Sequence, residues 1–94
     1  MKLEISAILA RGPQVVCTEL SDGGAVLLNL ENNYFYMLNQ EALVIWKCLD
    51  GKAGLSQVLK QILVEYDIDE QAAEAAVLEQ AGQFVAEHLA KVVA

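Results

Sequence analysis

Three short segments near the start of the chain are rich in strand-forming residues and are separated by turn residues. In the second segment, Val26, Leu28 and Leu30 recur at every second position, as in a half-buried strand. The Asn32-Asn33 pair that follows tolerates the positive φ of a tight hairpin, and residues 21–24 supply the preceding turn. We therefore predict an antiparallel meander with strands at residues 15–20, 25–30 and 34–38.

Helical spacing replaces the strand pattern from Asn39 onward. Asn39 is suited to cap a first helix, which we expect to end at Asp50-Gly51, where glycine can adopt a left-handed conformation. An unbroken apolar stripe from Leu55 to Tyr66 predicts a second helix, and Asp69 can cap a third. Three strands followed by three helices indicate an α+β domain of winged-helix-like type.

The predicted third helix carries two apolar rows. A helix that packs on one side needs a single stripe, so the second row either serves a partner, such as a second copy of the chain, or is buried as well. The pattern leaves both interpretations open. Gly82 costs about 1 kcal/mol relative to alanine, and a close approach by a neighbouring backbone or peptide would explain why it is tolerated. The rows are Ala73, Val77, Ala81 and Phe84, and Leu78, Val85, Leu89 and Val92.

Composition fits one domain that is unusually apolar. The 94 residues are 55% apolar and have a mean hydropathy of +0.34, so the chain either packs very efficiently or keeps apolar surface for a partner. We take residues 1–94 as a single domain in which residues 1–13 form an N-terminal arm. The apolar runs are too short for a signal peptide or a membrane span. Cys17 and Cys48 form no motif and are expected to be buried and reduced, which indicates the cytoplasm.

Charge argues against a nucleic-acid partner. Thirteen acidic residues against six basic ones give a net charge of -7, whereas phosphates require a Lys/Arg surface. A winged-helix regulator that binds protein or DNA remains the main alternative, although from Glu65 onward the chain has seven acids and only Lys91 as a base. An acyl-carrier-like protein is a weaker alternative, because Ser56 lies in Gly-Leu-Ser-Gln and not in an Asp-Ser-Leu setting.

Residues that could perform catalysis or hold a cofactor are sparse. His88 is the only histidine and has no cysteine or aspartate partner at a useful spacing. Gly23-Gly24 is not followed by the Lys-Ser/Thr of a phosphate loop, and the acidic run 65–74 lacks the glycine of a calcium loop. We therefore expect a binding protein without catalytic residues, metal or cofactor.

The strand predicted at residues 34–38 has the character of an open platform. Edge strands are normally protected by lysine, proline or a bulge, yet residues 33–38 contain neither charge nor proline. Such an edge can accept an extended peptide as an additional strand, with affinity from main-chain hydrogen bonds. The alternative is that the aromatic side chains of Tyr34, Tyr36 and Phe84 simply fill the core.

Short segments that follow one another in a set order carry a family resemblance. They are Leu27-Leu28-Asn29-Leu30, Tyr34-Phe35-Tyr36, Leu38-Asn39, Ile45-Trp46 and Leu49-Asp50-Gly51. This ordered set resembles the PqqD family, the small recognition elements for ribosomally made precursor peptides, and the resemblance runs from about Val15 to Leu89. It implies that the leader of a precursor peptide adds as an antiparallel strand to the third strand, in the groove beside the third helix.

The resemblance also implies a partner enzyme and a set of contact residues. The partner would be a maturation enzyme, either a radical SAM protein or a leader protease with its cyclase. We expect Phe84→Glu to weaken leader binding strongly while the domain stays folded. The expected peptide-binding residues are Asn33, Tyr34, Phe35, Tyr36, Met37, Val77, Ala81 and Phe84.

Two departures from the family pattern lie on the third helix. Ala76-Val77 stands where the family often has Asp-Val, and His88-Leu89 stands where it usually closes with Gly-Leu. Because the closing glycine is missing, we expect the last helix to continue past His88.

Overall fold

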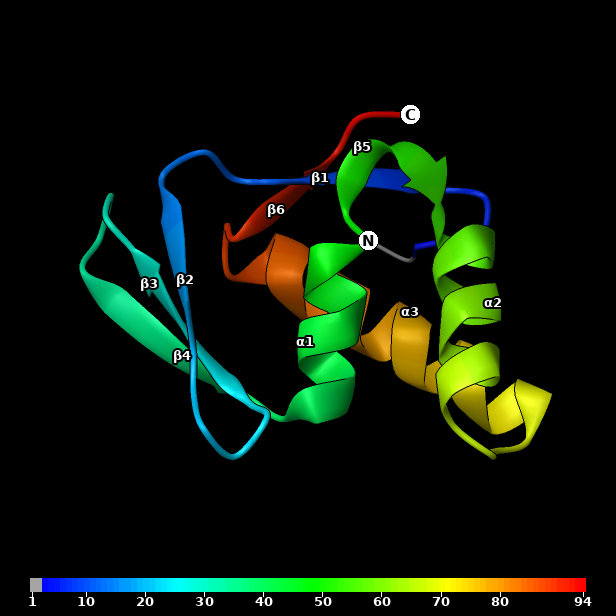
Figure 1. Cartoon of the computed structure of the whole chain (residues 1–94). Helices are drawn as coiled ribbons and strands as arrows, with labels where there is room; N and C mark the ends of the chain where they lie inside the picture. The colour runs from blue at the N-terminus through cyan, green and yellow to red at the C-terminus, as the bar shows by residue number, and fades with distance from the viewer. Residues whose placement is uncertain (1–2) are drawn as a thin grey trace.

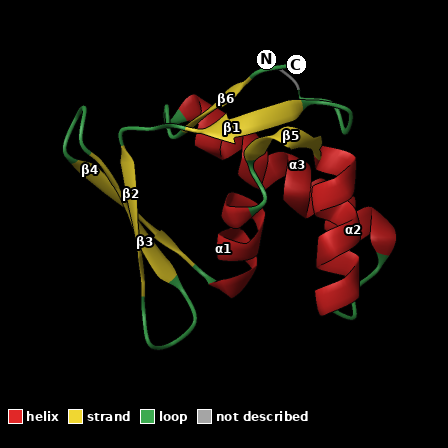
Figure 2. Ribbon diagram, turned by 45° about the horizontal axis from the view of Figure 1, so that its top comes forward, coloured by secondary structure: helices red, strands yellow, loops and turns green. Residues whose placement is uncertain are grey.

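The computed structural model describes residues 3–94, which form six strands and three helices. The helices are α1 (Gln40–Lys47), α2 (Leu55–Glu65) and α3 (Glu70–Ala86). The strands make two separate sheets, with the orders β2-β3-β4 and β5-β1-β6 (Figures 1 and 2). They are β1 (Ile8–Arg11), β2 (Val15–Glu19), β3 (Ala25–Asn29), β4 (Tyr34–Leu38), β5 (Asp50–Gly54) and β6 (Ala90–Val92).

The sheet β2-β3-β4 is the predicted antiparallel meander. Its strands pair without a bulge, so that Cys17 lies opposite Leu27 and Leu27 lies opposite Tyr36. Asn33 has a φ of 62°, the left-handed conformation that the hairpin was expected to use. The α+β fold class is confirmed.

The sheet β5-β1-β6 was not predicted. Residues 1–13 were expected to form an arm, yet they contain β1, the central strand of this sheet, which pairs antiparallel with β5 and β6. β5 reads Asp-Gly-Lys-Ala-Gly and β6 has only three residues, so neither carries a strand signal of its own. Each strand depends on partners that lie far away in the sequence. The sheet lies across the upper ends of α1 and α2 in Figure 2.

The start of α1 agrees with the prediction, but its end does not. The Asn39 side chain accepts a hydrogen bond from the Ala42 N–H at 2.8 Å, as an N-cap should. The helix ends at Lys47 with Cys48 as its C-cap. Gly51 does have a positive φ of 80°, but it lies inside β5 and does not close the helix.

The end of α3 corrects a second expectation. The helix does not continue past His88 but stops at Ala86, and His88 itself adopts a φ of 60°. The His88 N–H donates to the Val85 carbonyl and the Leu89 N–H to the Phe84 carbonyl, the hydrogen bonds of a Schellman motif. His88 therefore takes the left-handed position that glycine usually occupies, and Leu89 turns back into the core with 2% of its surface exposed.

The core lies between the three helices and the inner faces of both sheets. Trp46 of α1 meets Phe84 of α3 edge to face, with ring centroids 5.3 Å apart. Of the two apolar rows predicted for α3, the first is entirely buried, while Leu78 and Val85 of the second are half-buried. Within residues 3–94 no backbone atom of another segment comes close to Gly82, since the nearest atom to an added Cβ is Leu3 Cδ1 at 4.0 Å. The expected approach by a neighbouring backbone of the chain is therefore not found there, while contact between Gly82 and a bound peptide stays a prediction.

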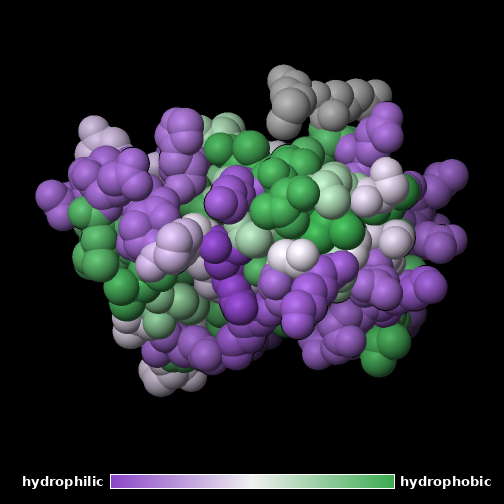
Figure 3. All heavy atoms as spheres, turned by 90° about the horizontal axis from the view of Figure 1, so that it is seen from above, coloured by the Kyte–Doolittle hydropathy of each residue, from purple (hydrophilic) through white to green (hydrophobic). Residues whose placement is uncertain are grey.

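Apolar side chains also remain on the surface of the described chain. Viewed from above, apolar side chains interrupt a mostly hydrophilic surface over the sheet β5-β1-β6 and at the side formed by the sheet β2-β3-β4 (Figure 3). Exposed apolar residues of these regions are Val16, Leu30, Tyr34, Phe35, Met37, Val92 and Val93.

Candidate functional site

Strand β4 is an open edge of the sheet β2-β3-β4. On the far side of β3, the Leu30 N–H donates to the Gln14 carbonyl and the Leu20 N–H to the Gly24 carbonyl. In an antiparallel sheet the hydrogen-bonding direction alternates along each strand. The odd-numbered residues of β3 therefore face β4, where they pair with Tyr34, Tyr36 and Leu38. It follows that Phe35 and Met37 direct their N–H and C=O groups to the open edge.

The side chains of β4 divide between two faces. Phe35 and Met37 lie on the outer face, with 66% and 67% of their surfaces exposed. On the inner face Leu38 is buried and Tyr36 is half-buried, whereas Tyr34 is exposed near the hairpin end. The alternative that Tyr34, Tyr36 and Phe84 fill the core is therefore wrong for Tyr34, while Phe84 of α3 is buried with 1% of its surface exposed. Asn33 turns the hairpin, and the Tyr34 N–H donates to the Asn32 side chain at 3.0 Å.

Helix α3 lies beside this strand, but it does not present the predicted row to the surface. Val77 and Ala81 are 0% exposed and Phe84 is 1% exposed, because this row packs into the core. Phe84→Glu would place a charge against Trp46, so we now expect it to unfold the domain instead of only weakening binding. The residues that α3 and its C-cap turn toward the strand and α1 are Ala76, Glu79, Gln80, Gln83 and, at the C-cap, Glu87.

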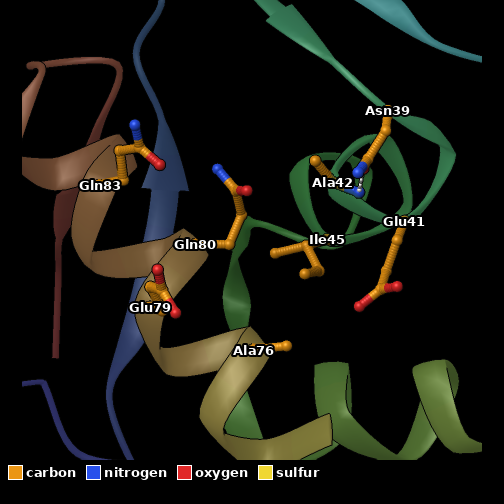
Figure 4. A pocket seen from close by; sticks show the side chains of 8 residues that line it. All are labelled: Asn39, Glu41, Ala42, Ile45, Ala76, Glu79, Gln80 and Gln83. Atoms are coloured by element: carbon orange, nitrogen blue, oxygen red, sulfur yellow. Dashed lines mark hydrogen bonds between the residues drawn. The ribbon is translucent and has the colours of Figure 1, made fainter. Parts of the chain in front are cut away.

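Two adjoining cavities follow this face of α3 and together form a groove. The cavity beside β4 measures about 100 Å³ and has an apolar floor made by Leu38, Phe84 and Leu89. The second cavity, of about 230 Å³, lies between α1 and α3 (Figure 4). Gln80 and Gln83 line both. We call this feature the β4–α3 groove. Its remaining lining residues are Tyr36, Met37 and Glu87 in the first cavity, and Asn39, Glu41, Ala42, Ile45, Ala76 and Glu79 in the second.

The groove is acidic. Glu41 and Glu79 line the second cavity and Glu87 the first, while no lysine or arginine among residues 3–94 lines either one. The Tyr36 hydroxyl donates a hydrogen bond to the Glu87 carboxylate, and this bond is the main cause of a raised Tyr36 pKa. The ion pair between Lys47 and Glu19, at 3.0 Å, joins residues that line neither cavity.

The two cysteines differ from the expectation in part. Both are free thiols, but Cys17 is exposed and only Cys48 is partly buried. Desolvation of the thiol raises the pKa of Cys17, and the nearby Glu19 carboxylate adds to this effect. Cys17 lines a separate open cavity with Trp46 and residues 11–13. A raised thiol pKa lowers the reactive thiolate fraction, so neither geometry nor charge marks Cys17 as a nucleophile.

Residues 3–94 show little sign of catalytic, metal-binding or membrane-spanning features. His88 is exposed at the end of α3. The described part of the chain contains no group of three or more His, Cys, Asp or Glu side chains that could hold a metal ion. None of the helices in that range is long and apolar enough to cross a membrane. The β4–α3 groove, where an open strand edge meets two adjoining cavities, is therefore the candidate site.

Comparisons with known proteins show a family match and two similar folds. Residues 24–90 match the family described as coenzyme PQQ synthesis protein D (PqqD). No curated protein matches the chain closely enough to count as a relative. Among solved structures, "TbiB1 in Complex with the TbiA(beta) Leader Peptide" has a TM-score of 0.78 and 21% identity, covering 87% of this chain and 94% of that one. "Lasso peptide synthetase B1 complexed with the leader peptide" has a TM-score of 0.77 and 19% identity, covering 88% and 96%.

Proposed function

The chain belongs to the PqqD family, and from this membership and the open edge of β4 we propose that it binds the leader segment of a ribosomally made precursor peptide. The leader adds as a strand to β4 and lies in the β4–α3 groove. The observation that carries the proposal is the orientation of Phe35 and Met37, whose backbone groups point to the open edge beside a formed groove. The two structural neighbours are described as complexes with leader peptides, which supports the same use of this fold.

Main-chain hydrogen bonds and apolar burial can both contribute to the free energy of leader binding. Phe35 and Met37 together offer two N–H donors and two C=O acceptors, and each hydrogen bond contributes about 1 kcal/mol net. One aliphatic side chain in the cavity over Leu38, Phe84 and Leu89 would add about 1.5–3 kcal/mol. The edge strand and the groove wall belong to regular elements, β4 and α3, that are formed without the peptide, so less ordering is required of the protein on binding.

The protein itself would perform no chemistry in this function. It captures the leader and presents the rest of the precursor to a separate maturation enzyme, such as a radical SAM protein or a leader protease with its cyclase. No cofactor or metal is needed for strand addition. A cytoplasmic location, where precursor peptides are made, fits the two free thiols.

The DNA-binding alternative is not favoured by the geometry. The groove face of α3 carries Glu79, and Glu87 follows at the C-cap, whereas a helix presented to phosphates would need lysine or arginine in such positions.

The test is fluorescence anisotropy with labelled N-terminal segments of short reading frames encoded beside this gene. One segment should bind with micromolar or tighter affinity. Gln83→Trp should block the groove and weaken this binding by about tenfold or more, since a large ring would occupy both cavities. Gln71→Trp, at an exposed position of α3 outside the groove, is the matched control and should leave affinity unchanged. Failure of every segment to bind the folded protein would refute the proposal.

A further inference from the structure

The groove is asymmetric along its length, which has consequences for the peptide it accepts. The cavity beside β4 has an apolar floor and a single carboxylate, Glu87, which accepts a hydrogen bond from Tyr36, whereas the cavity between α1 and α3 contains two carboxylates, Glu41 and Glu79. Figure 4 shows these two carboxylates on opposite sides of the second cavity, with Ile45 and Ala76 between them. In the described structure neither carboxylate has a hydrogen bond or an ion pair with another side chain, so both are available to a ligand.

The direction of the bound peptide follows from the sheet. Antiparallel pairing is slightly more stable than parallel pairing, and β2, β3 and β4 are already antiparallel. A peptide strand that pairs antiparallel with β4 therefore runs alongside it in the direction from Met37 to Phe35. Residues of the peptide that precede the paired segment then lie beyond Leu38, where β4 passes through Asn39 into α1 and the second cavity begins.

From these two features we infer that the groove selects a leader with a lysine or arginine on the N-terminal side of the segment that pairs with β4. The basic side chain enters the second cavity between Glu41 and Glu79, while an apolar side chain from the paired segment enters the cavity over Leu38, Phe84 and Leu89. This inference rests on the proposed function. It adds the charge of the ligand and the order of its two anchoring side chains.

A basic side chain of the leader would be attracted to the carboxylates of Glu41 and Glu79, an attraction that the uncharged lining residues of the groove cannot supply. Exposed and partly exposed charge pairs are worth about 0.2–1 kcal/mol each, and salt screens them strongly. The chain as a whole carries a net charge of -7, so a general attraction for basic peptides must be separated from a local one. The separation requires a control that removes the same number of charges elsewhere.

The experiment uses the leader segment that binds the wild-type protein, tested against two double variants. Glu41→Gln with Glu79→Gln removes both groove charges. Glu31→Gln with Asp67→Asn removes two exposed charges that line neither cavity. At about 0.05 M salt the groove variant should bind about three- to tenfold more weakly than wild type, and the difference should shrink at about 1 M salt. The control variant should stay within about twofold of wild type.

A second arm changes the peptide. Replacing the basic residue of the leader by glutamine should weaken binding to wild type but have no further effect on the groove variant. Equal affinities of wild type and groove variant, or equal weakening in both double variants, would overturn the inference while leaving the proposed function intact. Absence of any leader binding by wild type would instead refute the proposed function and the inference with it.

Discussion

The Tyr36 hydroxyl donates a hydrogen bond to the Glu87 carboxylate, which joins β4 to the end of α3 across 51 positions of sequence. Both residues line the cavity beside β4. The bond therefore fixes the distance between the strand and the helix that form the two walls of the β4–α3 groove.

This hydrogen bond should be visible in a pH titration. The Glu87 carboxylate stabilises the protonated phenol and thereby raises the Tyr36 pKa, with desolvation as a smaller cause. Since the folded-state pKa is raised, the stabilising contribution is present below the pKa of an unfolded-state tyrosine and is lost as pH rises through the folded-state pKa. Glu87→Gln should lower the Tyr36 pKa, measured from tyrosinate absorbance with Tyr36→Phe as the reference. An unchanged pKa would show that the bond is absent in solution.

Proline at position 35 should weaken leader binding more than alanine does. Proline has no N–H. An edge strand therefore tolerates proline at a position where the N–H of another residue would face solvent and not the neighbouring strand. Phe35→Pro removes one open-edge donor and should lower affinity about five- to tenfold, whereas Phe35→Ala keeps the backbone and should change it less than about twofold. Anisotropy titrations compare the two variants, and circular dichroism checks that both are folded. Equal losses would mean that the Phe35 side chain, and not the edge, contacts the leader.

Glycine at position 88 should stabilise the protein. His88 holds a φ of 60°, which costs a side-chain-bearing residue about 1–2 kcal/mol, partly offset by the greater freedom that glycine has when unfolded. We expect His88→Gly to raise the free energy of unfolding by about 0.5–1 kcal/mol, measured by urea denaturation. His88→Ala, which retains the strain, is the control. Destabilisation by glycine would indicate that the histidine side chain makes a stabilising contact.

Alanine at position 82 should also stabilise the protein, because here glycine occupies an ordinary helical position that does not require it. Gly82 lies inside α3 in a helical conformation, and an added Cβ would have Leu3 Cδ1 as its nearest neighbour at an ordinary 4.0 Å. Helix propensity then predicts a gain of about 0.5–1 kcal/mol in Gly82→Ala, measured in the same denaturation assay. A loss of stability would require backbone or peptide contact at Gly82 that the structure does not contain.

The meander and the starts of the helices could be predicted because their signals are local. Asn33 in the hairpin, Asn39 before α1 and Asp69 before α3 act on residues within a few positions, and the structure has all three in the expected roles. The sheet β5-β1-β6 could not be predicted, because Asp50–Gly54 becomes a strand only through pairing with β1. The end of α3 was also missed, since core burial of Leu89 outweighs the strain at His88.

Of the α3 residues chosen from the sequence, Val77 and Ala81 are buried in the core, whereas Phe84 forms part of the floor of the β4–α3 groove. Apolar character was used to choose Val77, Ala81 and Phe84, and the same character is what buries them. The face of α3 that lines the groove is the polar row that includes Gln80 and Gln83. Once the buried row is known, the helical period gives the position of this neighbouring row. No sequence signal distinguishes a groove glutamine from a solvated one.

Amide hydrogen exchange measured by NMR, with and without the bound leader, tests strand addition to β4 most directly. In the free protein, the Phe35 and Met37 amides should exchange fast because they face the open edge, whereas Tyr36, which pairs with Leu27, should exchange more slowly. With leader bound, Phe35 and Met37 should become protected together. Binding that leaves both amides in fast exchange would contradict strand addition at this edge.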